Sequence, residues 1–413
     1  MDLYTFYFDE SFHDRKLLVN DKGQINALRE DALENYVGVF WGCRCSDLKS
    51  NVEILQRFEK QQKKKFGLSD EQELKSTVIS KKNYIYGIRS FNKNTMSFYK
   101  ELFEALEVID PILQINMISK VEYFVRRLFE NLILPDGVNE NLFYYSITKI
   151  LFFYHNKELL QALYNVKDMN TTQNFCQLLI KNLNCILRVI DTIPRKIKEK
   201  EVIKQLINIL SRTEIVIEDK KKYDFAYFIN FDGLNNLLQE IHINISNVRL
   251  TIDQEENTYS NALKYSFAEV LQADSATNIQ IRLCDWISGF IGQMIYGIFH
   301  DKMIMEDSVE DIETIGENDV ERKHLLSKEW FDLSEDQFEL YKYIYETLIV
   351  QHQYKWTIMT LSYGDAASLF CSLIQYIAGY ESYEKFKSIS LEMYTEYYNS
   401  YCCESLERHY ENL

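Results

Sequence analysis

Proline and glycine are scarce in this chain of 413 residues, which holds only 3 prolines and 13 glycines. Globular proteins average about 7% Gly and about 5% Pro, so both residues that interrupt helices are rare here. This scarcity excludes collagen and a Pro-rich linker protein. The 29 tyrosines and 25 phenylalanines argue against general disorder, because they supply ample apolar surface to bury. The length is enough for about two to three domains, or for one domain with large insertions.

Targeting segments and membrane spans are also missing from the sequence. The first five residues lack the basic and apolar regions of a signal peptide. The longest apolar stretch, 286–299, is too short to span a bilayer. The 8 cysteines form no CxxC pair, and Cys43 and Cys45 have no His nearby at zinc spacing. We therefore expect reduced thiols in a cytoplasmic protein without a membrane segment.

Positive charge is in short supply, since 46 basic residues face 62 acidic ones and the formal net charge is −16. A protein that binds nucleic acid by charge alone is disfavoured, whereas a nuclease whose acidic residues hold metal ions is not. Substrate contacts would have to come from local basic patches. The candidates are Lys60 with 63–65, 195–196 with Lys198 and Lys200, and 220–222. Such lysine runs are also typical of solvated helix faces.

Aromatic and β-branched runs alternate with helical patterns along the chain, which is typical of an α/β protein. Strands are predicted at 3–8, 36–41, 112–118, 248–252 and 267–271. Helices are predicted at 48–66, 95–108 and 279–299, and apolar residues at three- and four-residue spacings predict a helical block over 139–238. The first strand is apolar on both faces and therefore fits the middle of a sheet.

This order of segments predicts one α/β core with a helical insertion, rather than independent domains. We expect the core to occupy 1–138 and 246–302, with the insertion at 139–245 between its two parts. An acidic loop is expected over 303–327, because 305–321 holds eight acidic side chains and no basic one. A tyrosine-rich helical C-terminal region then completes the chain over 328–413.

Carboxylates stand at the ends of two predicted strands. Asp9 directly follows the apolar run at 3–8, and Asp253 closes the run at 248–252. Alternation along a strand places Asp9 on one face of the sheet and Glu10 on the other. A carboxylate held rigidly beside a buried strand suits a divalent metal. The alternative is that each Asp simply ends a strand and begins a turn.

A third carboxylate, Asp285, lies near the start of the predicted 279–299 helix. The buried face of that helix is expected to consist of Ile287, Phe290, Ile291, Met294, Ile295 and Ile298. Asp285 lies opposite this stripe and shares its face with Gly289 and Gly292. Each helical Gly costs about 1 kcal/mol against Ala, so a backbone or a substrate is expected to pack closely there. The alternative is a tight helix–sheet contact, with Asp285 favoured by the helix dipole.

Several segments together resemble the domain-of-unknown-function 3800 family, whose members are bacterial and phage-related proteins with an RNase H-like fold. The segments that carry the resemblance are FYFDES at 6–11, ELKS at 73–76, DS at 274–275 and IQIRLCDWISG at 279–289. Their order matches the family, and the resemblance covers about 1–120 and 245–300. The chain departs from the family pattern at 12–13 and at Cys284, and its insertion and C-terminal region are longer.

The resemblance implies an RNase H-like mixed sheet core and a metal-dependent nuclease. Such a hydrolase would cleave phosphodiester bonds of RNA or DNA by a two-metal mechanism with Mg²⁺ or Mn²⁺. The residues implied as both catalytic residues and metal ligands are Asp9, Glu73, Asp253 and Asp285. The accessory candidates are Glu10, Ser11, His13 and Asp274. Carboxylates are the hard oxygen ligands that magnesium prefers, and anti-phage defence is one setting that the resemblance implies.

Other functions stay open at this point. The chain could be a non-catalytic RNase H-like interaction protein that binds a protein partner, or forms a homodimer, through its helical parts. A phosphoryl-transfer enzyme on the same carboxylates is a further alternative. A P-loop NTPase is disfavoured, because no GxxxxGK[ST] element is present. Tyr7 and Trp286 either stack on nucleic-acid bases or belong to the core. His13 either orients a water molecule or lies in an exposed turn.

Overall fold

A six-stranded mixed sheet organises the chain. The computed structural model describes residues 2–11, 35–129, 132–154, 157–166, 168–193, 196–215, 228–307 and 325–410. The strand order is β7-β6-β1-β2-β3-β8. The strands are β1 (Tyr4–Ser11), β2 (Asn35–Arg44), β3 (Ile112–Ser119), β6 (Val248–Asp253), β7 (Glu269–Ala273) and β8 (Ile358–Met359). The predicted α/β class is confirmed, and the first strand lies in the middle of the sheet.

The pairing of β1 with β6 joins the early and late parts of the chain. β2 runs antiparallel to both β1 and β3, while β6 runs parallel to β1, β7 parallel to β6, and β8 parallel to β3. Phe8 is the register partner of Ile252 across the parallel pair. The chain therefore returns to the edge of its first strand after the helical block, as one α/β core requires.

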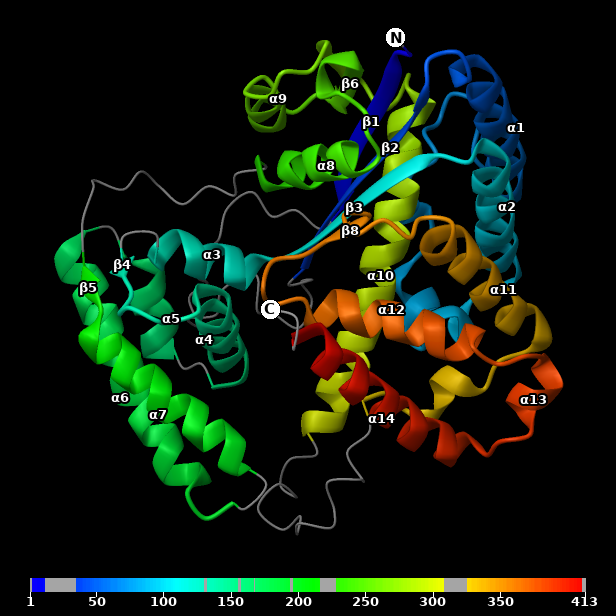
Figure 1. The fold of residues 1–413 in the computed structure, drawn as a ribbon. Coiled ribbons are helices and arrows are strands. Elements are labelled where there is room, and N and C mark those ends of the chain that lie inside the picture. Colours follow the sequence, from blue (N-terminus) through cyan, green and yellow to red (C-terminus); the bar gives the residue numbers. More distant parts are fainter. Residues whose placement is uncertain are drawn as a thin grey trace.

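Helices cover the sheet on both faces (Figure 1). On one face lie α1 (Leu48–Phe66), α2 (Lys93–Ile109) and α10 (Ile279–Asp307), and on the other lie α8 (Phe228–Glu240) and α9 (Glu256–Ala262). Tyr7 and Trp41 point into the α10 core, whereas Phe8 and Phe40 point into the α8 core. This alternation follows from the two-residue period of a strand, and it places Asp9 on the same face as Tyr7.

The helix α10 is the centre of the larger core. The six side chains of its predicted apolar stripe are each at most 2% exposed, so that prediction is confirmed. Trp286, outside the stripe, is fully buried as well. The helix continues to Asp307, so the first residues of the predicted acidic loop are helical instead. The rest of that loop, 308–324, lies outside the described residues.

The helical block builds a core of its own. It contains α3 (Lys120–Phe129), α4 (Glu140–Tyr154), α5 (Lys157–Tyr164), α6 (Met169–Ile190), α7 (Ile197–Arg212) and the two short strands β4 (Leu132–Ile133) and β5 (Glu214–Ile215). The predicted insertion at 139–245 also includes α8. In the structure, however, Phe231 and Leu234 of α8 pack on the sheet, and the insertion core already begins with Val121. Hydrophobic spacing within a helix does not reveal which core its face will join.

The C-terminal region packs against the α10 side of the molecule. Its helices are α11 (Glu335–Tyr345), α12 (Asp365–Ala378), α13 (Tyr383–Lys387) and α14 (Leu391–Tyr410), and it also supplies β8. Tyr394 and Tyr398 are buried, and the Tyr394 ring stacks on Phe331 at 5.5 Å between centroids. These two aromatic side chains are therefore part of the core, and a partner surface on the C-terminal helices stays a prediction. Among the helices that the structure describes, none is long and apolar enough to cross a membrane.

Gly297 provides a test of how closely α10 packs. A Cβ atom at this position would lie 2.2 Å from the backbone oxygen of Tyr84. Ala normally stabilises a helix interior by about 1 kcal/mol over Gly. Here we expect Gly297→Ala to lower the free energy of unfolding by about 1–3 kcal/mol, because the backbone of Tyr84 has to move. Urea denaturation measures the change, and a variant as stable as the wild type would contradict this packing.

Candidate active site

Asp9 and Asp253 lie side by side on adjacent parallel strands. Phe8 pairs with Ile252, so the next residue on each strand is an aspartate, and adjacent strands are about 4.8 Å apart. Both side chains belong to the face of the sheet that α10 covers, because Phe8 and Ile252 point to the opposite face. Asp9 was expected just past the strand but lies within β1, which continues to Ser11. Both carboxylates are partly exposed.

The helix α10 brings Asp285 to the same place. The Cys284 thiol donates to the Tyr7 carbonyl with a sulfur–oxygen distance of 3.3 Å. One turn later, the hydroxyls of Ser288 and Ser11 share a hydrogen bond of 2.8 Å. These two contacts flank Asp9 along β1 and flank Asp285 along α10. The two aspartates therefore face each other across the contact between strand and helix.

Asp285 is oriented by Ser76, which the sequence analysis did not single out as a site residue. The Ser76 N–H donates to Asp285 Oδ2 at 2.6 Å, and the Ser76 hydroxyl donates to Oδ1 at 2.8 Å. Gly289 leaves the space for this contact, since a Cβ atom there would lie 2.4 Å from Ser76 Cβ. Close packing at Gly289 is therefore confirmed, but the partner is the side chain of Ser76 and not the predicted backbone or substrate. The only sign of this role in the sequence was the position of Ser76, which directly follows the ELK element at 73–75.

The segment around Ser76 also delivers Glu73 and Lys75. The Trp286 indole N–H donates to the Leu74 carbonyl at 2.7 Å, and the Leu74 side chain is buried. This anchor and the Ser76 anchor fix the backbone of Lys75 from both sides. Lys75 Nζ lies 3.3 Å from Glu73 Oε2 in an ion pair. Trp286 is thus a core residue and not a base-stacking surface.

The start of α10 is fixed to α1 by a buried ion pair. Arg282 Nη2 donates to Glu59 Oε2 at 2.9 Å, and Arg282 Nη1 donates to the Ser275 carbonyl. Breaking such a pair by removing one partner is costly, because it leaves an unpaired buried charge. The pair therefore fixes the helix three residues before Asp285.

Mutual repulsion marks these carboxylates as a cluster. Burial, followed by the charge of Asp285 and then of Asp253, raises the pKa of Asp9 well above its ordinary value of 3.8. Burial also raises the pKa of Asp285, against the opposing effects of the Ser76 hydrogen bonds and Lys75, and Glu73 raises it further. Asp253 and Asp285 therefore act electrostatically on Asp9, and Glu73 acts on Asp285.

The donor set of this cluster fits a hard divalent cation, because carboxylate oxygens are the ligands that Mg²⁺ and Mn²⁺ prefer. Within the described ranges, no three His, Cys, Asp or Glu side chains stand close enough to hold a metal ion as they lie. The residues that would hold it are Asp9, Asp253 and Asp285, with Glu73 at the margin. These carboxylate side chains would have to rotate toward one another to bind one metal ion together.

The accessory candidates divide between different roles. Glu10 points to the other face of the sheet, where burial and then the charges of Asp9 and Glu255 raise its pKa well above the ordinary value. Glu255, which is 8% exposed and directly precedes α9, was missed, although it lies two residues after Asp253. Asp274 is exposed, and its Oδ1 accepts the Ala276 N–H in a turn. His13 lies outside the described residues.

Four of the seven predicted basic residues in the described ranges make structural contacts, whereas Lys60, Lys64 and Lys198 are exposed. Lys63 is buried and donates to the Asp70 carbonyl at 3.0 Å, at the C-terminal end of α1. Lys65 pairs with Glu101, Lys196 with Glu199, and Lys200 with Asp191. The residues at 195 and 220–222 lie outside the described ranges. Paired lysines contribute little positive field, so these patches give weak support to nucleic-acid contacts.

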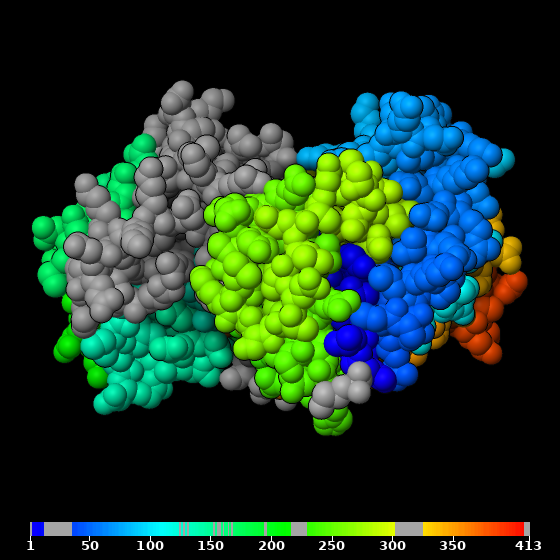
Figure 2. All heavy atoms as spheres, turned by 90° about the horizontal axis from the view of Figure 1, so that it is seen from above, coloured from blue at the N-terminus to red at the C-terminus, as the bar shows by residue number. Residues whose placement is uncertain are grey.

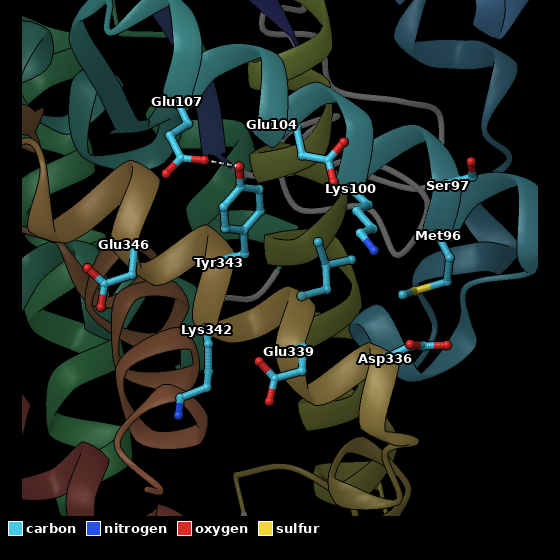
Figure 3. Close-up of a pocket in the computed structure, with 11 residues that line it drawn as sticks. Met96, Ser97, Lys100, Glu104, Glu107, Asp336, Glu339, Lys342, Tyr343 and Glu346 are labelled. Atoms are coloured by element: carbon cyan, nitrogen blue, oxygen red, sulfur yellow. Dashed lines mark hydrogen bonds between the residues drawn. The ribbon is translucent and has the colours of Figure 1, made fainter. Parts of the chain in front are cut away.

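The surface offers two different hollows. In Figure 2, atoms of the N-terminal segment that includes β1 are visible between the segment with β6, α9 and β7 and the segment with α1. A separate hollow of about 690 Å³ lies between α2 and α11 (Figure 3). Its charged lining residues are Glu104, Glu107, Asp336, Glu339, Glu346, Lys100 and Lys342. This excess of acidic side chains disfavours binding of a nucleic-acid backbone in the hollow. None of the predicted site residues lines this hollow.

Comparison of the chain with protein-family models, with curated proteins and with solved structures finds no match. The resemblance carried by the 6–11, 73–76 and 274–289 segments therefore stays a prediction. The cytoplasmic location stays a prediction as well.

The raised pKa of Asp9 predicts a pH-dependent gain in stability from Asp9→Asn in metal-free protein. The titratable groups that face Asp9 or adjoin it are Asp253, Asp285, Cys284, Lys75 and Glu10. Because the folded pKa of Asp9 exceeds its unfolded value, ionisation costs folding free energy as pH rises from the unfolded pKa through the folded one. The variant should therefore melt about 2 °C or more above the wild type near neutral pH.

Thermal unfolding in the presence of a chelator measures this gain, which should vanish below about pH 4, where the unfolded aspartate is protonated too. The exposed Asp70→Asn variant is the matched control and should show no gain. Equal or lower stability of Asp9→Asn across the whole pH range would contradict the repulsion.

Proposed function

We propose that this protein is a metal-dependent nuclease with an RNase H-like core, which hydrolyses phosphodiester bonds of RNA or DNA. The observation that carries the proposal is the approach of Asp253 and Asp285 to Asp9, which precedes both of them by more than 200 residues in the chain. The charges of Asp285 and Asp253 raise the pKa of Asp9, and a cluster of this kind is more typical of a functional site than of a stabilising core.

The sheet supports the RNase H-like part of the proposal. We expect the first three strands of such a core to pair antiparallel in chain order. We expect later strands to be added beside the first strand and parallel to it. The order β7-β6-β1-β2-β3 has this arrangement, with β6 parallel to β1. The edge strand β8 and the C-terminal helices are then additions to the core, and so is the insertion with its separate hydrophobic core.

Each residue of the site has a separable role in this proposal. Asp9 and Asp253 are held by the sheet and would bind the metal from one side, and Asp285 would bind it from α10. Ser76 orients the Asp285 carboxylate through two hydrogen bonds, so it is a positioning residue. A divalent cation bound there supplies an activated water and neutralises charge on the reacting phosphate.

Substitution of the ligands tests the proposal. We expect Asp9→Asn and Asp285→Asn each to lower Mg²⁺- or Mn²⁺-dependent cleavage by more than about a hundredfold, since even the groups that orient metal ligands contribute about 10- to 100-fold. For the same reason Ser76→Ala should lower cleavage by about tenfold. Release of labelled fragments from RNA, single-stranded DNA and duplex DNA measures the activity and identifies the substrate.

Asp70→Asn, on an exposed residue three positions before Glu73, is the control and should retain full activity. Full cleavage by an Asp9→Asn, Asp285→Asn double variant would reject the site. Absence of cleavage by the wild type on all three substrates would favour a non-catalytic interaction protein instead.

A further inference from the structure

Lys75 is the basic residue of the carboxylate cluster, and the proposed function gives it no role. Its side chain is 56% exposed, while that of its partner Glu73 is 18% exposed. The ion pair between them is 3.3 Å long. The charge of this lysine also acts on Asp9 and Asp285. One ammonium group therefore serves several carboxylates that converge from four segments of the chain.

The position of Lys75 is built into the fold. The backbone on its N-terminal side is anchored by the Trp286 indole at the Leu74 carbonyl, and on its C-terminal side by Ser76 at Asp285. Lys75 has an extended backbone with φ −95° and ψ 155°. Because both neighbours are fixed, only the flexible side chain can move the ammonium group toward or away from the cluster.

The electrostatics agree with this geometry. Partial burial opposes the charge of Lys75, but Glu73, followed by Asp285 and Asp253, raises its pKa above the ordinary 10.5. The ammonium therefore stays charged at neutral pH and offsets part of the repulsion among the carboxylates. A divalent cation would offset the same repulsion from the same carboxylates, and it would repel the Lys75 ammonium beside Glu73.

We propose that Lys75 is the resident cation of this cluster and competes with the divalent metal for Glu73. The inference rests on the proposed function for the identity of the metal. Entry of a metal ion then requires the Lys75 ammonium to leave Glu73, which its exposed side chain allows. The lysine stabilises the metal-free protein and, by the same interaction, weakens metal binding.

Substitution of Lys75 by Met, which keeps an unbranched side chain and removes the ammonium group, tests the competition. We expect Lys75→Met to bind Mn²⁺ about three- to tenfold more tightly than the wild type in isothermal calorimetry at low salt. The same variant should melt at a lower temperature than the wild type in a chelator, because the carboxylates then lack their counter-ion. Lys82→Met, on an exposed lysine seven residues along the chain, should change neither quantity.

A double-mutant cycle with Glu73→Gln separates competition from a general effect of charge. In the Glu73→Gln background, Lys75→Met should tighten Mn²⁺ binding by less than in the wild-type background. Lys75→Arg keeps the charge, and its Mn²⁺ affinity should stay within about twofold of the wild type.

Equal or weaker Mn²⁺ binding by a folded Lys75→Met protein overturns the role of Lys75 and leaves the nuclease proposal intact. Failure of the wild type itself to bind Mn²⁺ overturns both, so the two failures are distinguishable. If Lys75→Met does not fold, the Lys75→Gln variant carries the same test, and unchanged Mn²⁺ affinity in that variant overturns the role.

Discussion

The repulsion among Asp9, Asp253 and Asp285 is the constraint on which the rest of this structure depends. Separate carboxylates would move apart into water, yet here a parallel strand pair fixes two of them and a buried helix fixes the third. The fold offsets the repulsion with two hydrogen bonds from Ser76 and with the charge of Lys75. A free energy cost that is maintained by so many specific contacts indicates selection for function rather than for stability.

The remainder of the molecule supports this point of the sheet. The helix α10 is buried along most of its length, and Arg282 with Glu59 fixes its start. The aromatic C-terminal helices enlarge the core around the same helix, which explains why so few glycines and prolines are needed. The insertion, with its own core, leaves β1 and β6 in contact although the helical block separates them in sequence.

Much of this arrangement could be predicted from the sequence. The apolar strands, the buried stripe of α10 and the crowding at Gly289 follow from local patterns, because they depend on short-range periodicity. The role of Ser76 could not be predicted, since it depends on a contact across 209 positions of the chain. The packing of α8 on the sheet and the strand β8 were missed for the same reason: a helix face or a two-residue strand does not specify its distant partner. The predicted Asp253 and Asp285 do act on Asp9, and Glu73 acts on Asp285. Strand alternation predicts the face on which a carboxylate lies, but not whether its oxygens come close enough to others to share a metal ion.

The central proposal is that the three aspartates bind a divalent metal. Anomalous diffraction from crystals of the full chain grown with saturating Mn²⁺ measures this directly. We expect an anomalous peak within coordination distance of oxygens of Asp9, Asp253 and Asp285, with the Lys75 ammonium moved away from Glu73. Ordered aspartates with no peak between them at saturating Mn²⁺ would contradict it.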